Sequence, residues 1–122
     1  NDTIAKLQEH NQDVKLDKKQ QMATRIMEYI CKNYSQDISL DELSEKFRIS
    51  KTYINNLLKS FYHRSFLDIL QDYRLKEAKK MILENQYKIS EIAEKVGYHD
   101  ISYFIRVFKK KYGVTPNNYG KH

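Results

Sequence analysis

The sequence of 122 residues has few of the residues that interrupt helices or crosslink chains: three Gly, one Pro, one Cys and no Trp. So few Gly and Pro favour helices over a turn-rich β-sandwich and leave little from which to build a glycine-rich phosphate-binding loop. The single cysteine, Cys31, excludes an intrachain disulfide and favours a reducing cytosol. No apolar run reaches the roughly 18–20 residues of a membrane span, and no signal peptide opens the chain. We therefore expect a cytoplasmic protein and, because the sequence begins at Asn1 rather than Met, a fragment excised from a longer one.

Positive charge is what the sequence has in excess, with 22 Lys and Arg against 16 Asp and Glu and a net charge of +6. Its length fits a single domain. Two windows, residues 48–64 and 101–122, hold no acidic residue. Runs of like charge are often solvated helix faces, but two such windows inside helical patterns indicate two surfaces that face a polyanion.

Apolar residues spaced by three and four predict a series of helices. The first spans about residues 18–34, with a stripe of Met22, Ile26, Tyr29, Ile30 and Tyr34. A capping box of Ser39 and Glu42 opens a short helix, and Ser50 caps a longer one. The apolar positions of that longer helix are Tyr53, Ile54, Leu57, Leu58 and Phe61. A short helix, a tight turn and a longer basic helix are typical of a helix-turn-helix, here at about residues 39–62.

The rest of the chain holds a long helix and then a second copy of this pattern. The long helix covers about residues 65–84, and residues 92–96 then repeat residues 43–47 position by position. Gly97 supplies the second turn, and Asp100 can cap a second recognition helix. Its core stripe is Tyr103, Phe104, Val107 and Phe108. The second helix-turn-helix thus covers about residues 89–112, and Thr115 and Pro116 start a final turn.

The sequence therefore predicts an all-α fold in which two helix-turn-helix subdomains are joined by a long central linker helix, within a DNA-binding domain of residues 18–122. A linker helix of about 19 residues spans about 28 Å. Successive major grooves on one side of a duplex are about 34 Å apart, so one chain can set two recognition helices into adjacent grooves.

Residues 1–17 form a polar arm before the first helix. Ile4, Leu7, Asn11 and Val14 follow a 3-4-3 spacing that can end a coiled coil with Asn at an a position. Two heptads are few for such an assignment. We favour a frayed linker between domains and keep the coiled coil as the alternative.

Several stretches of the sequence carry a resemblance to a known family. They are residues 89–98 (ISEIAEKVGY), 102–110 (SYFIRVFKK) and 113–116 (GVTP), together with Tyr119 and with Arg74, Leu75 and Ala78 of the linker helix. From about residue 18 to its end the chain resembles the DNA-binding domain of AraC/XylS-type transcription regulators, in a lysine-rich variant similar to those attached to bacterial response-regulator receivers. Leu58 and His63 depart from the family pattern, which commonly has Phe and Gly there, and this questions the fine geometry of the first motif.

The resemblance implies a bacterial protein that binds double-stranded DNA at promoters, and the tandem order of two different motifs in one chain predicts that the site is asymmetric. It implies RNA polymerase and an upstream sensor or receiver domain as partners, and no cofactor. On the second recognition helix it places base readers at Ile101, Ser102, Ile105 and Arg106. Arg106 can make a bidentate contact with guanine, and Ile101 and Ile105 suit thymine methyl groups. Ile105 can alternatively contact another part of the protein, and Arg106 a phosphate or an intramolecular salt-bridge partner.

On the first recognition helix the resemblance marks Thr52, Asn55 and Asn56 as base-facing, and Asn can read adenine in the major groove. Adjacent asparagines have poor helix propensity, which argues against a packing role alone, although one of them can simply be solvated. Phosphate contacts, which fix register rather than sequence, are expected from Lys51, Lys59, His99, Lys109 and Lys110.

The sequence offers no arrangement suited to catalysis or metal binding. Four histidines lie in separate elements, without Cys or His neighbours at ligand spacing: His10, His63, His99 and His122. Cys31 would need an activated thiolate to act as a nucleophile. We therefore predict a DNA-binding protein that is not an enzyme and holds no metal. The alternative is a helical protein-interaction module, which would not need acid-free recognition helices in both repeats.

Overall fold

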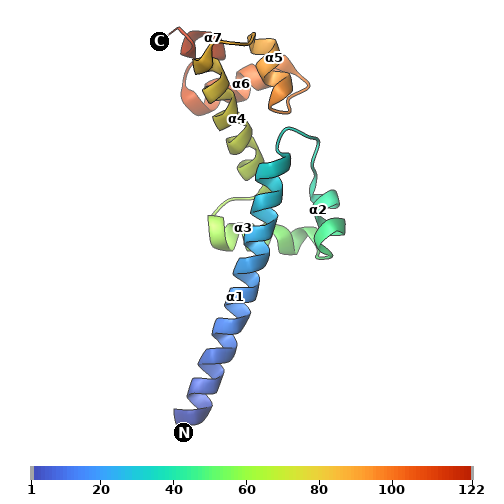
Figure 1. The fold of residues 1–122 in the computed structure, drawn as a ribbon, viewed down its shortest axis with the longest axis vertical. Coiled ribbons are helices and arrows are strands. Elements are labelled where there is room, and N and C mark those ends of the chain that lie inside the picture. The colour runs from blue at the N-terminus through green and yellow to red at the C-terminus, as the bar shows by residue number, and fades with distance from the viewer. Residues whose placement is uncertain (1, 122) are drawn as a thin grey trace. The chain divides into compact units, whose positions relative to one another are not determined.

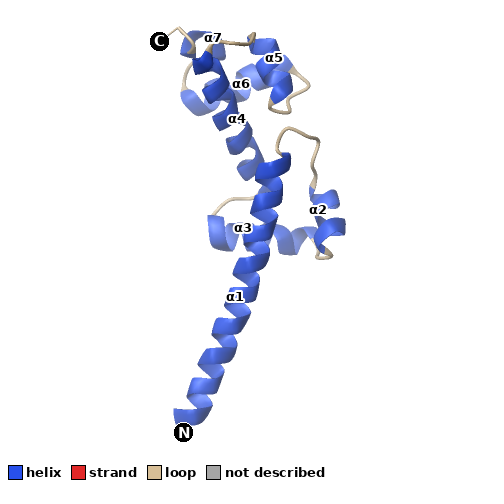
Figure 2. Ribbon diagram, in the orientation of Figure 1, coloured by secondary structure: helices blue, strands red, loops and turns tan. Residues whose placement is uncertain are grey.

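The computed structural model describes the backbone of residues 2–121 and the side chains of residues 14–121. Within that backbone range the chain forms helices and loops and no strand (Figure 2). The predicted all-α fold is therefore confirmed. Figure 1 labels the helices, which are α1 (Asp2–Asn33), α2 (Leu40–Phe47), α3 (Lys51–Tyr62), α4 (Phe66–Glu84), α5 (Ile89–Lys95), α6 (Ile101–Tyr112) and α7 (Pro116–Tyr119).

α1 begins at Asp2, so the arm that we expected to be a frayed linker is helical in this structure. The physical reason is local, because residues 2–33 contain no Gly or Pro that would interrupt a helix. The coiled-coil alternative rests mainly on Ile4, Leu7 and Asn11, whose side chains lie outside the described ones. Val14, the last residue of that pattern, is exposed.

The chain packs into two compact units. The first comprises the residues up to Ile30 together with Ser39–Phe66, and the second comprises Cys31–Ile38 together with the residues from Leu67 onward. Each unit contains one helix-turn-helix, and α4 belongs almost entirely to the second unit.

The first unit is built on α2 and α3, which contact each other, and on α1 up to Ile30. The Ser39 hydroxyl accepts a hydrogen bond from the Glu42 amide (3.2 Å), and the Ser50 hydroxyl caps α3 through the Tyr53 amide (3.0 Å). α2 ends at Arg48, whose backbone has a left-handed φ of 56°. The buried side chains of this unit are Ala23, Ile26, Ile30, Leu43, Ile54, Leu57, Leu58 and Phe66.

The second unit packs α4 to α7 around one apolar cluster. Its buried members are Leu75, Ala78, Ile82, Ile92, Ala93, Val96, Tyr98, Phe104, Val107 and Phe108. Asp100 caps α6 by accepting from the amides of Ser102 (2.9 Å) and Tyr103 (3.3 Å). Gly113 ends α6 with a φ of 81°, and Thr115 caps the short α7, which Pro116 opens. The repeat seen in the sequence is therefore also a structural repeat, since α3 and α6 are both side-chain-capped helices of 12 residues.

Candidate nucleic-acid interface

α3 presents most of the residues expected to bind DNA on its exposed surface. Thr52, Asn56 and Lys59 are exposed. Lys51 is exposed too, and its Nζ lies 2.7 Å from Asp41 Oδ1 in an ion pair that is largely open to solvent. Such an exposed pair contributes little to stability, so a phosphate can compete for Lys51.

Asn55 differs from its neighbour Asn56. It is half-buried, and its Oδ1 accepts a hydrogen bond from the backbone amide of Phe66 (3.0 Å), the first residue of α4. The first amides of a helix have no partner within the helix, and the Phe66 amide is one of them. Asn55 therefore caps α4, although it lies 11 residues earlier in the sequence. The two adjacent asparagines therefore have different surroundings, which the sequence left open.

α6 presents an equivalent surface in the second unit. Ser102 and Arg106 are exposed, and Ile101 is 39% exposed. Ile105 is only partly buried and packs against the apolar cluster of its unit, in agreement with the alternative of contact with the protein itself. Because residue 103 aligns with residue 53, Ile105 occupies the position in α6 that Asn55 occupies in α3, and both side chains face inward in part.

Two tyrosines assigned to the core stripes lie instead at the surface. Tyr53 is 38% exposed and Tyr103 is 41% exposed, so the prediction that they are core residues is wrong. Both sit at the third position of their helices, where the spacing pattern does not distinguish an inward from a sideways direction. The guanidinium of Arg106 lies over the Tyr103 ring, with Cζ 5.3 Å from the ring centroid.

The three consecutive lysines at the end of α6 divide into two groups. Lys109 and Lys110 are exposed, as a phosphate contact requires. Lys111 Nζ lies 2.6 Å from Asp72 Oδ1 and connects α6 to α4. Sequence reasoning did not single out this pair, and a separation of 39 residues leaves no local pattern from which to find it.

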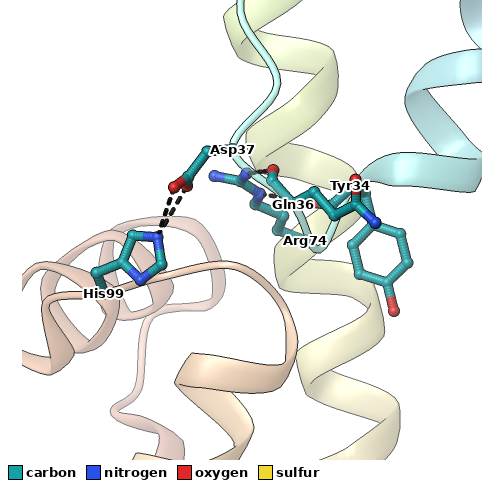
Figure 3. Close-up of polar contacts among 5 residues, drawn as sticks. All are labelled: Tyr34, Gln36, Asp37, Arg74 and His99. Atoms are coloured by element: carbon teal, nitrogen blue, oxygen red, sulfur yellow. Dashed lines mark hydrogen bonds and ion pairs between the residues drawn. The ribbon is translucent and has the colours of Figure 1, made fainter.

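His99, expected to contact phosphate, hydrogen-bonds to a carboxylate of the segment between α1 and α2. Its Nε2 lies 2.8 Å and 3.0 Å from the two carboxylate oxygens of Asp37 (Figure 3). Both side chains are mostly exposed, at 67% for His99 and 75% for Asp37. A phosphate would have to compete with Asp37 for this imidazole.

The same segment is held by Arg74 of α4. Arg74 Nε donates to the carbonyl oxygen of Tyr34 (2.7 Å), and its Nη2 donates to that of Gln36 (2.8 Å) (Figure 3). Burial lowers the pKa of the Arg74 guanidinium, since desolvation disfavours its charge. The sequence marked Arg74 only through the family resemblance, and the structure supplies the physical role.

Two observations concern the reactive thiol and the metal site considered above. Burial raises the pKa of the Cys31 thiol, opposite to the direction of an activated nucleophile. Among the side chains of residues 14–121, no group of three or more His, Cys, Asp or Glu could hold a metal ion; His10 and His122 lie outside that range. No described helix is both long and apolar enough to span a membrane.

Comparison with known proteins identifies the family. A helix-turn-helix domain model matches residues 43–122. The chain belongs to the AraC/XylS family. It is 37% identical over 95 residues to the HTH-type transcriptional activator CfaD and 36% identical over 95 residues to the DNA-binding dual transcriptional regulator Rns, both from Escherichia coli.

These two alignments cover 78% of this chain but 36% of each relative, so this AraC/XylS-type chain spans about a third of the length of the curated relatives it matches. Among solved structures, the chain is similar to the C-terminal domain of AraT, a response regulator from Geobacillus stearothermophilus. The identity is 36% and the TM-score 0.79, with 82% of this chain and 84% of that chain covered.

The two departures from the AraC/XylS pattern leave the backbone of the first motif regular. Leu58 is fully buried, as an apolar replacement for Phe should be. His63 takes a left-handed φ of 63° and its amide donates to the Lys59 carbonyl (3.0 Å), matching the bond from Gly113 to Lys109 at the end of α6. The first helix-turn-helix thus ends as the second does, with a residue less suited to that conformation.

Proposed function

We propose that the chain binds double-stranded DNA sequence-specifically, as the output domain of a bacterial transcription regulator. The observation that carries this proposal is the repeated recognition helix, because α3 and α6 both have exposed polar and basic residues and neither contains an acidic residue. Such faces suit the phosphate backbone and the base edges of a major groove. The names of the relatives support it, since CfaD is a transcriptional activator and Rns a DNA-binding regulator.

In this proposal the residues divide into readers of bases and binders of phosphate. Exposure favours five of the expected base readers, Thr52, Asn56, Ile101, Ser102 and Arg106. Asn55 and Ile105 are half-buried and contribute less. Phosphates are bound by Lys51, Lys59, His99, Lys109 and Lys110, which fix the register on the duplex.

We further propose residues 18–122 as the DNA-binding domain and residues 1–17 as an arm that leads to an upstream sensor or receiver domain. The likeness to a response-regulator C-terminal domain supports a link to two-component signalling. RNA polymerase is the proposed protein partner, and the cytoplasm the proposed location. The role is one of binding rather than catalysis.

Selection of sites from random duplex DNA, followed by mobility shifts over a range of salt concentrations, tests the proposal. We expect an enriched asymmetric site and a slope of log K against log[salt] of roughly −4 to −7, from about four to eight phosphate contacts. Lys59→Ala or Lys109→Ala should weaken binding to all sequences similarly and flatten the slope by about one. No enriched sequence, or an affinity independent of salt, would indicate the protein-interaction module instead.

A further inference from the structure

Tyr103 combines two features that the fold of the second unit does not require. The residue is 41% exposed, although an aromatic side chain on a helix beside a large apolar cluster can be buried. It also lies one helical turn before Arg106, whose guanidinium carbon is 5.3 Å from the ring centroid. At this distance the guanidinium is attracted to the face of the ring.

The Tyr103 ring is itself held in place. The ring of Tyr98, which is buried, lies 6.0 Å from it at an interplanar angle of 52°. Arg74 lies over the Tyr98 ring in turn, with Cζ 5.5 Å from the centroid, and donates two hydrogen bonds to backbone carbonyls. The Tyr103 amide is fixed as well, because it donates to Asp100 Oδ1 (3.3 Å).

We propose that Tyr103 is a positioning residue for Arg106 and sharpens its preference for guanine. The inference rests on the proposed function, in which Arg106 reads a base. An exposed arginine loses side-chain freedom when its planar fork pairs with guanine O6 and N7. A ring that already restricts the guanidinium reduces that loss, and binding that depends on the fork geometry becomes more selective.

The first motif provides an internal comparison. Tyr53 is the counterpart of Tyr103 and is similarly exposed, at 38%. The residue three positions later is Asn56, which has no positive charge for the ring to hold. The positioning effect is therefore confined to α6, and Tyr53→Leu is a matched control for Tyr103→Leu.

The experiment starts from the full chain and the site obtained by selection from random duplexes. Arg106→Ala first identifies the base pair that Arg106 reads, because substituting that base pair weakens binding less in this variant than in the unmutated chain. For each other variant we then measure the dissociation constant for the duplex substituted at that base pair, divided by the dissociation constant for the selected duplex. We expect Tyr103→Leu to lower this ratio roughly two- to fivefold, a magnitude typical of exposed cation–π contacts. Tyr103→Phe, which keeps the ring, should leave the ratio unchanged, as should Tyr53→Leu.

Side-chain relaxation of the Arg106 Nε–H group in the DNA-free protein gives a second readout. Tyr103→Leu should increase its mobility, whereas Tyr103→Phe should not. The inference is overturned if the Tyr103→Leu ratio is unchanged or if the loss of affinity is equal for all sequences. If Arg106→Ala itself alters the preference at no base pair, the proposed role of Arg106 in base reading fails, and the inference fails with it.

Discussion

Gly97 lies at a φ of +104°, and a Cβ placed on it would lie 2.9 Å from Arg74 Nε and 3.0 Å from Arg74 Cζ. Gly113 also has a positive φ, +81°, but a Cβ there meets nothing within 4 Å. We expect Gly97→Ala to cost about 2–3 kcal/mol in the free energy of unfolding, from strain and from displacement of a fixed arginine. Gly113→Ala should cost about 1 kcal/mol, from strain alone. Urea unfolding of the two variants checks this, and equal losses would contradict the role given to Arg74.

Tyr98 predicts a dependence of stability on alkaline pH. Burial raises the pKa of its hydroxyl from 10.0 to about 12. In the unfolded chain the phenol ionises near pH 10, so the folded state keeps its full stability below that pH and loses some as pH rises toward 12. We expect Tyr98→Phe to reduce this loss by about 1–2 kcal/mol at pH 12.

Urea titrations at pH 7, 10 and 12 measure this difference. Other tyrosines with raised pKa values, such as Tyr34 and Tyr112, keep some alkaline loss in the variant. At pH 7 the variant should be at least as stable as the natural chain, because the buried hydroxyl finds no hydrogen-bond partner within the described part of the chain. An unchanged alkaline loss would show that Tyr98 is not the group responsible.

The adjacent asparagines of α3 should separate stability from DNA recognition. Asn55→Ala removes the acceptor for the Phe66 amide and should cost about 1 kcal/mol in stability. Asn56→Ala should leave stability within about 0.5 kcal/mol, because the side chain is exposed, and should relax base preference in one part of the site. Thermal unfolding and site selection on both variants measure the two effects. A loss of stability in Asn56→Ala together with a change of base preference in Asn55→Ala would contradict these two roles.

At the scale of elements, the starts of α2, α3, α6 and α7 were predictable because their capping residues are local, whereas α1 starts well before the predicted residue 18. Ser39, Ser50, Asp100 and Thr115 all accept a hydrogen bond from an amide two or three residues on. Side-chain directions at the edge of a stripe were less predictable, and Tyr103 is the clearest example. Contacts between distant elements could not be found from spacing at all.

The features of the candidate site that could not be predicted from the sequence are contacts between residues far apart in the chain. The bonds of Arg74 to Tyr34 and Gln36 join residues about 40 positions apart. The pair of His99 with Asp37 spans 62 positions. Nothing in the neighbourhood of His99 indicates that a carboxylate lies beside it. The roles of the exposed residues on α3 and α6 in base reading remain predictions.

The ends of α3 and α6 offer a reciprocal exchange. His63 and Gly113 both end a helix of 12 residues in the left-handed region. A non-glycine residue there is strained, so His63→Gly should raise stability by about 0.5–1 kcal/mol, and Gly113→His should lower it by a similar amount. Urea unfolding measures both. A loss of stability in His63→Gly would mean that the imidazole makes contacts worth more than the strain.

At the scale of the whole molecule, the tandem arrangement predicts an asymmetric site with two specified patches about 10 base pairs apart. The connecting helix α4 has 19 residues and is about 28 Å long. Inserting 5 base pairs between the patches turns them to opposite sides of the duplex. We expect binding to fall to the level of a single motif, as mobility shifts with the original and lengthened sites would measure. An insertion of 10 base pairs tests distance without rotation, and full tolerance of the 5-base-pair insertion would contradict the joint action of the motifs.

No single cut of the chain separates the two units, because the second unit includes Cys31–Ile38 as well as the residues from Leu67 onward. If the chains of two relatives were joined at residue 66, Arg74 of one parent would therefore bind the connector, residues 34–39 between α1 and α2, of the other parent. Arg74 binds that connector through backbone carbonyls, which every sequence possesses. Relatives whose connectors differ in sequence can thus be recombined if the backbone of the connector keeps the same conformation. Residues 37 and 99 must also keep side chains that can hydrogen-bond to each other.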